Sequence, residues 1–332
     1  EWVAVHRKHH ARCETEEDPH SPKILGIQNV LWRGSELYRE AAKNKEDLTK
    51  FGHATPDDWL ERNLYSRFHN LGIAILFGCY LVLFGTAGIC VWAVQMLWIP
   101  FFAAGVINGI GHYWGYRNFE CADAATNIVP WGLLVCGEEL HNNHHTYPSS
   151  AKLSNKPWEI DLGWFYIRFF QLTGLAKVKK IAPKPTLAAA KVEVDKETLL
   201  SVVNHRFHIM AQYSKQVLIP VLKDEIQSLE GRSSKQFRKY RHILIRHDNL
   251  LDPHSRSKLA KVCEGNSRIK TVYQYKLELQ KLWHRSTQSS EALCESLRQW
   301  CQNAEQSGEQ VLVEFSRQIR KYRQPLDVAV ST

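Results

Sequence analysis

The chain has 332 residues, 44% of them hydrophobic, and a formal net charge of +9. Its eight cysteines include no C-x-x-C pair, which argues against a disulfide framework or a cysteine zinc site and suits a reducing compartment. Residues 1–185 hold 19 Lys and Arg against 18 Asp and Glu, a net charge of +1. Residues 186–332 hold 24 against 16, a net charge of +8. This difference indicates two different domains in one chain.

The first predicted element is a helix that carries His6-Arg7-Lys8-His9-His10. Histidines at positions i, i+3 and i+4 lie on one helical face, within an arc of about 100°. We therefore expect their three imidazoles to converge on one point. Neutral imidazole suits iron, zinc, copper or nickel, so this pattern by itself leaves the metal open.

The second predicted element is an apolar hairpin, because no Asp, Glu, Lys or Arg occurs between Arg67 and Arg117. Crossing about 30 Å of hydrocarbon takes about 20 helical residues, so this stretch suits two crossings. We expect helices over Asn70–Phe84 and Ile89–His112, with a break near 85–88. Two crossings return the chain to the side it left, and basic residues on both flanks mark that face as cytoplasmic.

Further candidate ligands follow the hairpin. Asn108 and His112 share a face at the end of its second helix. An ionisable side chain in a membrane helix is energetically unfavourable, so its presence indicates a functional role. His141-Asn142-Asn143-His144-His145 then repeats the first cluster's spacing on the same side of the hairpin. Four carboxylates are candidates to orient the imidazoles: Asp18, Asp123, Glu138 and Asp161.

The last third reads as a basic helical extension. Pro183 and Pro185 interrupt any helix, so we place the boundary between residues 1–182 and 183–332. Amphipathic helices are expected over Thr271–Ser286 and Ser289–Ala304. Their expected buried positions are Leu277, Leu282, Leu293, Leu297 and Trp300. A solvated bundle, or contact with a membrane surface or redox partner, fits this composition.

Three segments, Glu1–Pro22, Asn108–Tyr116 and Gly137–Pro148, resemble the membrane-bound di-iron fatty-acid desaturases, specifically the acyl-CoA delta-9 branch and its bacterial relatives. The resemblance implies two irons held by His6, His9, His10, His112, His141, His144 and His145, with Asn108 reaching iron through a water. It also places Trp2 against the acyl chain. The family's first histidine box and first membrane hairpin are absent, so an N-terminally truncated member is expected.

This resemblance implies an all-α integral membrane fold and an oxidoreductase similar to stearoyl-CoA 9-desaturases. Two irons and O₂ would supply the oxidant that an unactivated C–H bond requires. The substrate would be a fatty acyl-CoA or acyl-lipid in the inner membrane of a bacterium. The sequence has neither the cysteine spacing of an iron–sulfur protein nor a G-x-G-x-x-G dinucleotide-binding loop. We therefore expect the electrons to come from a separate ferredoxin-type or cytochrome-type donor and its reductase.

Two alternatives remain. A membrane di-iron hydroxylase shares histidine boxes and would leave a hydroxyl group in place of a double bond. A nucleic-acid-binding protein could use the basic extension, which faintly resembles the helical end of certain bacterial transposases. Because the first half is expected in a bilayer, nucleic acid is not the expected partner.

Overall fold

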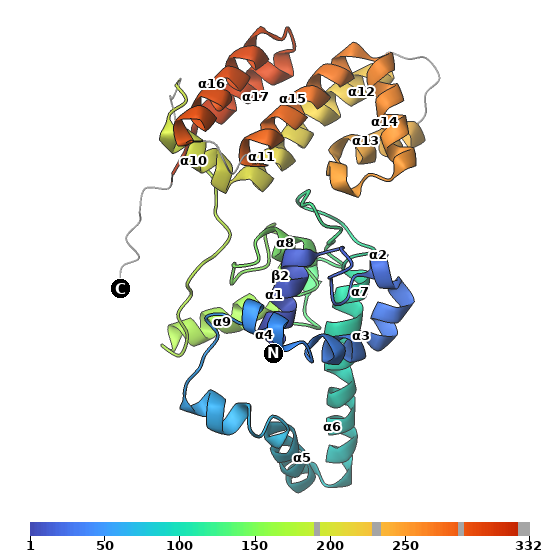
Figure 1. Cartoon of the computed structure of the whole chain (residues 1–332), viewed down its shortest axis with the longest axis vertical. Helices are drawn as coiled ribbons and strands as arrows, with labels where there is room; N and C mark the ends of the chain where they lie inside the picture. The colour runs from blue at the N-terminus through green and yellow to red at the C-terminus, as the bar shows by residue number, and fades with distance from the viewer. Residues whose placement is uncertain (189–192, 228–233, 285–288, 325–332) are drawn as a thin grey trace. The chain divides into compact units, whose positions relative to one another are not determined.

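The computed structural model describes residues 1–188, 193–227, 234–284 and 289–324. It is mostly helical and divides into two compact units (Figure 1). Unit 1 comprises residues 1–117 and 123–181, and unit 2 comprises residues 118–122 and 182–332. The main chain leaves unit 1 after Ile181, next to the boundary expected from the two prolines.

Unit 1 begins with short helices around the first histidine cluster. They are α1 (Trp2–Arg12), α2 (Pro22–Leu25), α3 (Ile27–Ala41), α4 (Lys45–Phe51) and the π-helical turn η1 (Glu61–Tyr65). The Asn44 side chain caps α4 by accepting from the Asp47 backbone N–H. The Arg7 guanidinium donates to the Phe51 and His53 carbonyls, which holds α1 against the end of α4.

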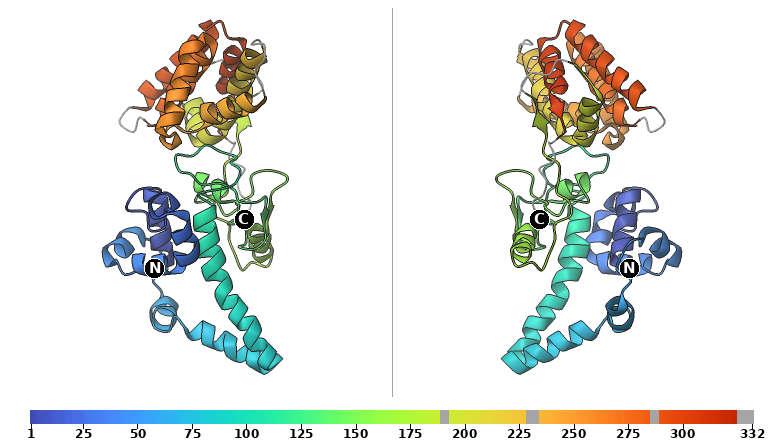
Figure 2. Two further views of the ribbon diagram at one scale, coloured as in Figure 1. Left: turned by 90° about the vertical axis from the view of Figure 1, so that its right-hand side faces the viewer. Right: turned by 90° about the vertical axis from the view of Figure 1, so that its left-hand side faces the viewer.

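An apolar hairpin follows, formed by α5 (Leu71–Phe84) and a long helix that starts at Thr86 (Figure 2). The long helix runs through α6 (Thr86–Ile99), the π-helical η2 (Pro100–Ile107) and α7 (Asn108–Ile110). Gly85 makes the turn with φ 56° and ψ −140°, a conformation that only glycine adopts readily. A Cβ on Gly88 would lie 2.1 Å from the Tyr80 carbonyl oxygen, so its absence lets α6 approach α5.

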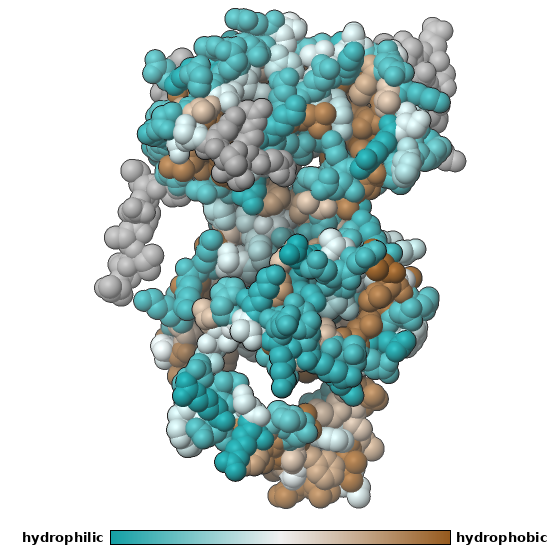
Figure 3. Space-filling view, viewed as in Figure 1, coloured by the Kyte–Doolittle hydropathy of each residue, from teal (hydrophilic) through white to brown (hydrophobic). Residues whose placement is uncertain are grey.

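The hairpin is as expected in position, but only one helix of the described residues is long enough to cross a membrane. Thr86–Ile110 has 25 residues, about 37 Å at 1.5 Å per residue. This helix starts at Thr86, three residues before the expected start at Ile89. Helix α5 has 14 residues, about 21 Å, which is short of about 30 Å of hydrocarbon. Exposed apolar side chains cover this end of unit 1 (Figure 3).

Glycines bring α3 close to the far end of the long helix. A Cβ on Gly34 would lie 2.2 Å from the Ala104 carbonyl oxygen, and one on Gly105 would lie 2.3 Å from that of Leu31. Residues without side chains are therefore needed on both sides of this crossing. The crossing fixes the end of the long helix, and with it His112, beside the N-terminal helices.

The rest of unit 1 contains α8 (His141–Thr146), α9 (Leu162–Leu172) and a parallel pair of two-residue strands, β1 (Trp131–Gly132) and β2 (Ile160–Asp161). Asp161 caps α9 by accepting from the Trp164 backbone N–H. These strands, with a second pair in unit 2, are the sheet structure of the described residues.

Unit 2 is a helical bundle with its own apolar core, built from residues between Val194 and Tyr322. Its elements are α10 (Lys196–Asn204), α11 (Arg206–Tyr213), η3 (Ser214–Leu218), α12 (Ile219–Gln227), α13 (Ser234–Ile245), η4 (Asp248–Leu250), α14 (Pro253–Gly265), α15 (Ser267–His284), α16 (Ser290–Gln306) and α17 (Gln310–Arg320), with antiparallel β3 (Thr186–Leu187) and β4 (Tyr322–Arg323). The side chains of Asp195, Asp252 and Ser289 cap three of these helices.

Both amphipathic helices expected here are present, as α15 and α16. The predicted end of the first, Ser286, lies outside the described residues. Leu282, Leu297 and Trp300 are buried as expected, whereas Leu277 and Leu293 are partly buried against the core.

Candidate metal centre

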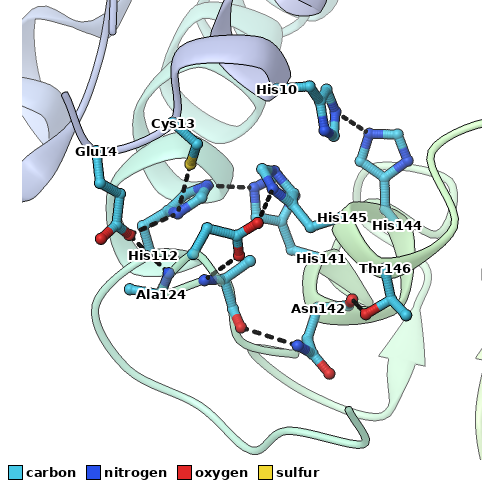
Figure 4. A network of polar contacts seen from close by, with 12 residues as sticks. His10, Cys13, Glu14, His112, Ala124, His141, Asn142, His144, His145 and Thr146 are labelled. Atoms are coloured by element: carbon cyan, nitrogen blue, oxygen red, sulfur yellow. Dashed lines mark hydrogen bonds and ion pairs between the residues drawn. The ribbon is translucent and has the colours of Figure 1, made fainter. Parts of the chain in front are cut away.

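The two histidine boxes lie on α1 and α8, and their side chains face each other. The Nε2 atom of His144 lies 3.0 Å from that of His6 and 2.9 Å from that of His10, and the His6 and His10 atoms are 3.2 Å apart. Three ring nitrogens from two distant segments thus form a closed triangle, the His6 cluster (Figure 4 shows its His10–His144 edge).

Hydrogen bonds alone cannot satisfy this triangle. A nitrogen of a neutral imidazole is either a donor or an acceptor, so three mutually adjacent nitrogens include at least one pair of the same kind. A cation that takes a lone pair from each nitrogen removes the conflict. Nitrogens about 2.1 Å from one ion lie about 3.0 Å apart at a right angle, which matches these separations.

A second group, the His9 cluster, contains His9, His112, His141 and His145. The His9 Nε2 lies 3.1 Å from that of His112 and 3.3 Å from that of His145. The His141 Nε2 lies 3.0 Å from that of His112. His112 comes from the end of the long helix, so three separate segments meet here, as Figure 4 shows for its labelled residues.

Each box divides its histidines between the two clusters, so the expectation that three imidazoles converge on one point was wrong. In the first box, His6 and His10 enter one cluster and His9 the other. At about 100° per residue, position i+4 lies about 40° from i, whereas i+3 lies about 60° to the other side. A single box can therefore serve two adjacent centres.

Burial keeps five of these imidazoles neutral. It is the largest cause that lowers the pKa of His6 to about 4 and that of His141 to about 3. Burial also holds the pKa of His9, His10 and His145 well below 6.5. Their lone pairs are thus free of protons at neutral pH, which is the form that binds a metal.

Carboxylates lie behind the ring nitrogens that face away from the His9 cluster. Asp18 Oδ1 lies 2.8 Å from His9 Nδ1, and both side chains are fully buried. Asp123 Oδ2 lies 3.2 Å from His145 Nδ1, and Glu138 Oε2 lies 3.9 Å from His141 Nδ1. A carboxylate in this position fixes ring orientation and raises ligand basicity, so the expectation for Asp18 and Asp123 agrees with the geometry.

The expectation for Asp161 was wrong. Its oxygens accept from the backbone N–H groups of Leu153, Ser154 and Trp164, which makes it a structural cap of the loop and of α9. The fourth carboxylate at the site is instead Glu14, whose Oε1 lies 3.5 Å from His112 Nδ1 and accepts from the Ala124 N–H. Glu14 has φ 63°, a local turn that the sequence pattern did not reveal.

Two more residues near the His9 cluster were not among the expected ligands. Cys13 Sγ lies 3.9 Å from His112 Nδ1. The His20 ring stacks 4.1 Å from that of His9, and His9, Asp18 and His20 could together hold an ion. The Asp-Pro-His element was the available signal for His20.

The asparagines of the second box hold α8 in place. Asn143 exchanges hydrogen bonds with Asn127 and donates to Glu159, and Asn142 donates to the Ala125 carbonyl. All six residues of α8 are buried. The box thus contains both candidate ligands and the side chains that orient them.

The remaining expected site residues lie close by. Asn108 is buried one helical turn before His112. Trp2 is half exposed and stacks on His6 with ring centroids 6.1 Å apart.

Comparison with known proteins gives the lineage of this site. Residues 1–159 match the sequence model described as fatty acid desaturase. These residues belong to the fatty acid desaturase family. The match contains every histidine of both clusters and ends before α9.

Proteins similar to this chain come from a plant and cyanobacteria. The chain is 32% identical to "Delta-9 acyl-lipid desaturase 2" of Arabidopsis thaliana, over 54% of this chain and 58% of the relative. It is 32% identical to an "sn-1 stearoyl-lipid 9-desaturase" of Anabaena variabilis, over 55% and 66%, and 33% identical to the protein of that name from Synechocystis, over 57% and 58%. The aligned part thus spans 58–66% of these relatives.

The second half of the chain matches a different family. Residues 196–330, almost all of the helical bundle, match the sequence model described as transposase. No solved structure matches the chain.

Proposed function

We propose that this chain takes part in O₂-dependent desaturation of a fatty acyl chain. The observation that carries the proposal is the pair of adjacent imidazole clusters, assembled from α1, α8 and the end of the long helix. Two irons would be held by the seven histidines and by Asn108 through a water. When bound, they would supply the oxidant for hydrogen removal, a reaction that protein side chains cannot perform.

The chain's own residues would orient the histidine ligands and contact the acyl chain. The carboxylates of Asp18, Glu14 and Asp123 would hold His9, His112 and His145 in one orientation. Trp2, stacked on His6 and partly exposed, would contact the acyl chain as it approaches the His6 cluster.

We propose an acyl-lipid substrate and the delta-9 position, because relatives in both a plant and cyanobacteria carry these names. An acyl-CoA is the other carrier that the sequence resemblance admits. The chain would lie in a bacterial inner membrane with both clusters on the cytoplasmic face, where a ferredoxin-type or cytochrome-type donor and its reductase would supply electrons.

The test is product analysis in membranes of a host that lacks its own desaturase. Expression with labelled stearate should give a labelled double bond at carbon 9, first in lipids rather than in acyl-CoA. Labelled hydroxy acid would establish the hydroxylase alternative instead. A chain that makes neither product, although iron analysis finds the metal bound, would contradict desaturation.

A second candidate function concerns unit 2 alone. The transposase match and the net charge of +8 over residues 186–332 favour nucleic-acid binding by this unit. Unit 2 has its own core, so it can be tested in isolation. DNA retention that falls steeply with salt would support this function, and no retention at low salt would exclude it.

A further inference from the structure

Helix α9 exposes an apolar face that nothing in unit 1 covers. The exposed fractions are 64% for Phe165, 53% for Phe169 and 80% for Leu172. Tyr166 and Phe170 are also exposed, and the helix has no fully buried residue. At about 100° per residue these five side chains fall within an arc of about 160°. A contiguous apolar face of this size on a soluble surface marks an interaction site.

The same surface continues onto the strands before α9. Trp131 and Ile160 are register partners in the β1–β2 pair, and both are exposed. Leu133 and Leu134 follow, also exposed, and the Leu134 carbonyl accepts a hydrogen bond from Trp98 Nε1 on α6. The segment that pairs with the strand before α9 therefore contacts the candidate membrane helix.

The direction and the charge of this segment indicate what covers it. Helix α9 runs crosswise to α6, as the views along different axes show (Figures 1 and 2). Three exposed lysines follow it, Lys177, Lys179 and Lys180. A crosswise helix with an aromatic face and adjacent lysines is typical of a segment that lies in the headgroup region of a bilayer.

We propose that α9, with Trp131 and Ile160 before it and the three lysines after it, is a membrane-surface anchor that binds anionic lipid headgroups. The anchor would hold the His6 and His9 clusters at a fixed distance from the membrane surface, because α9 and α8 belong to the same unit. This inference rests on the membrane placement in the proposed function and is independent of its chemistry.

Photo-crosslinking on the full chain in mixed phosphatidylcholine–phosphatidylglycerol vesicles tests the anchor. A p-benzoylphenylalanine is placed at Phe169, and in separate chains at Val82 on the exposed apolar hairpin and at Glu17 on the exposed loop after α1. We expect lipid adducts at positions 169 and 82 and none at 17. Adducts with a second copy of the chain at position 169, or no lipid adduct there, would overturn the proposal. The result at position 82 then shows whether membrane placement fails with it.

The charge of the lipid is tested in the same system. Lys177, Lys179 and Lys180 are changed together to Gln, a variant that leaves every cluster residue intact. We expect a several-fold lower yield of lipid adduct at position 169, and a similar loss when phosphatidylglycerol is omitted. An unchanged yield in both cases would overturn the assignment of anionic headgroups.

Discussion

The buried pair of His9 and Asp18 shows how single residues prepare this site. Their 2.8 Å contact leaves the opposite ring nitrogen of His9 facing His112 and His145. Burial raises the pKa of Asp18, so this carboxylate is costly to bury and its position needs a compensating role. Orientation of a ligand is such a role.

Changing Asp18 to Asn tests it. The amide keeps the shape but loses the charge that supports His9, so iron affinity should fall by about 10–100-fold. Competition with a chelator measures the affinity. Glu17→Gln, one residue away and exposed, is the control and should leave the affinity unchanged. Equal affinities in all three proteins would show that Asp18 has only a structural role.

The His6 cluster predicts a loss of metal with one substitution. Changing His144 to Ala removes the corner that contacts both His6 and His10. Metal analysis of the iron-loaded protein should then find about one ion fewer per chain, because a single-sided pair of imidazoles binds weakly. His69→Ala, at an exposed position, should keep the full content. Retention of the same content by His144→Ala would place the ion elsewhere.

At the scale of the elements, the crossing of α3 and η2 fixes the position of His112 beside the N-terminal helices. Changing Gly34 to Ala would put a methyl group 2.2 Å from the Ala104 carbonyl oxygen. Overpacking of this kind should destabilise unit 1 by about 1–3 kcal/mol. Gly78→Ala in α5 is the matched control, since its Cβ meets nothing within 4 Å. Thermal unfolding in detergent should separate the two, and equal melting temperatures would mean that the crossing can relax.

Lys276 on α15 is a buried cap for a neighbouring helix. Its ammonium donates to the carbonyls of Leu244 and Arg246 at the end of α13, at 3.0 and 2.9 Å. Lys276→Met would remove both of these hydrogen bonds and should destabilise isolated unit 2 by about 1–3 kcal/mol in urea unfolding. Lys281→Met, at an exposed position of the same helix, should change little. A stable Lys276→Met protein would show that water replaces the ammonium.

Sequence patterns predicted much of this arrangement, and their failures have physical causes. The spacing of the boxes pointed to six of the seven clustered histidines, and the end of the apolar helix pointed to His112, because both signals are local in the sequence. It could not show how the rings divide between two clusters, which depends on where α1, α8 and His112 meet. Glu14 was missed and Asp161 was wrongly chosen for the same reason, since only tertiary contacts decide which carboxylate reaches an imidazole and which caps a loop.

At the scale of the whole molecule, unit 2 has its own core, and the two units match different families. Removing residues 186–332 should therefore leave the metal content unchanged, because every candidate ligand lies in unit 1. Iron analysis of the shortened, membrane-inserted chain measures this, with His144→Ala in the same background as the low-metal control. A shortened chain that is inserted but binds no iron would mean that unit 2 completes the site.

The closed triangle of His6, His10 and His144 should affect how fast the protein is degraded in a cell. Without a cation, like ring nitrogens face one another at about 3 Å, so the empty chain holds an electrostatic conflict in its interior. Metal binding and folding are then linked, and the metal-free chain should open more often and be degraded first. When iron is scarce, the amount of this protein should fall even at constant synthesis, which makes its abundance a readout of iron supply.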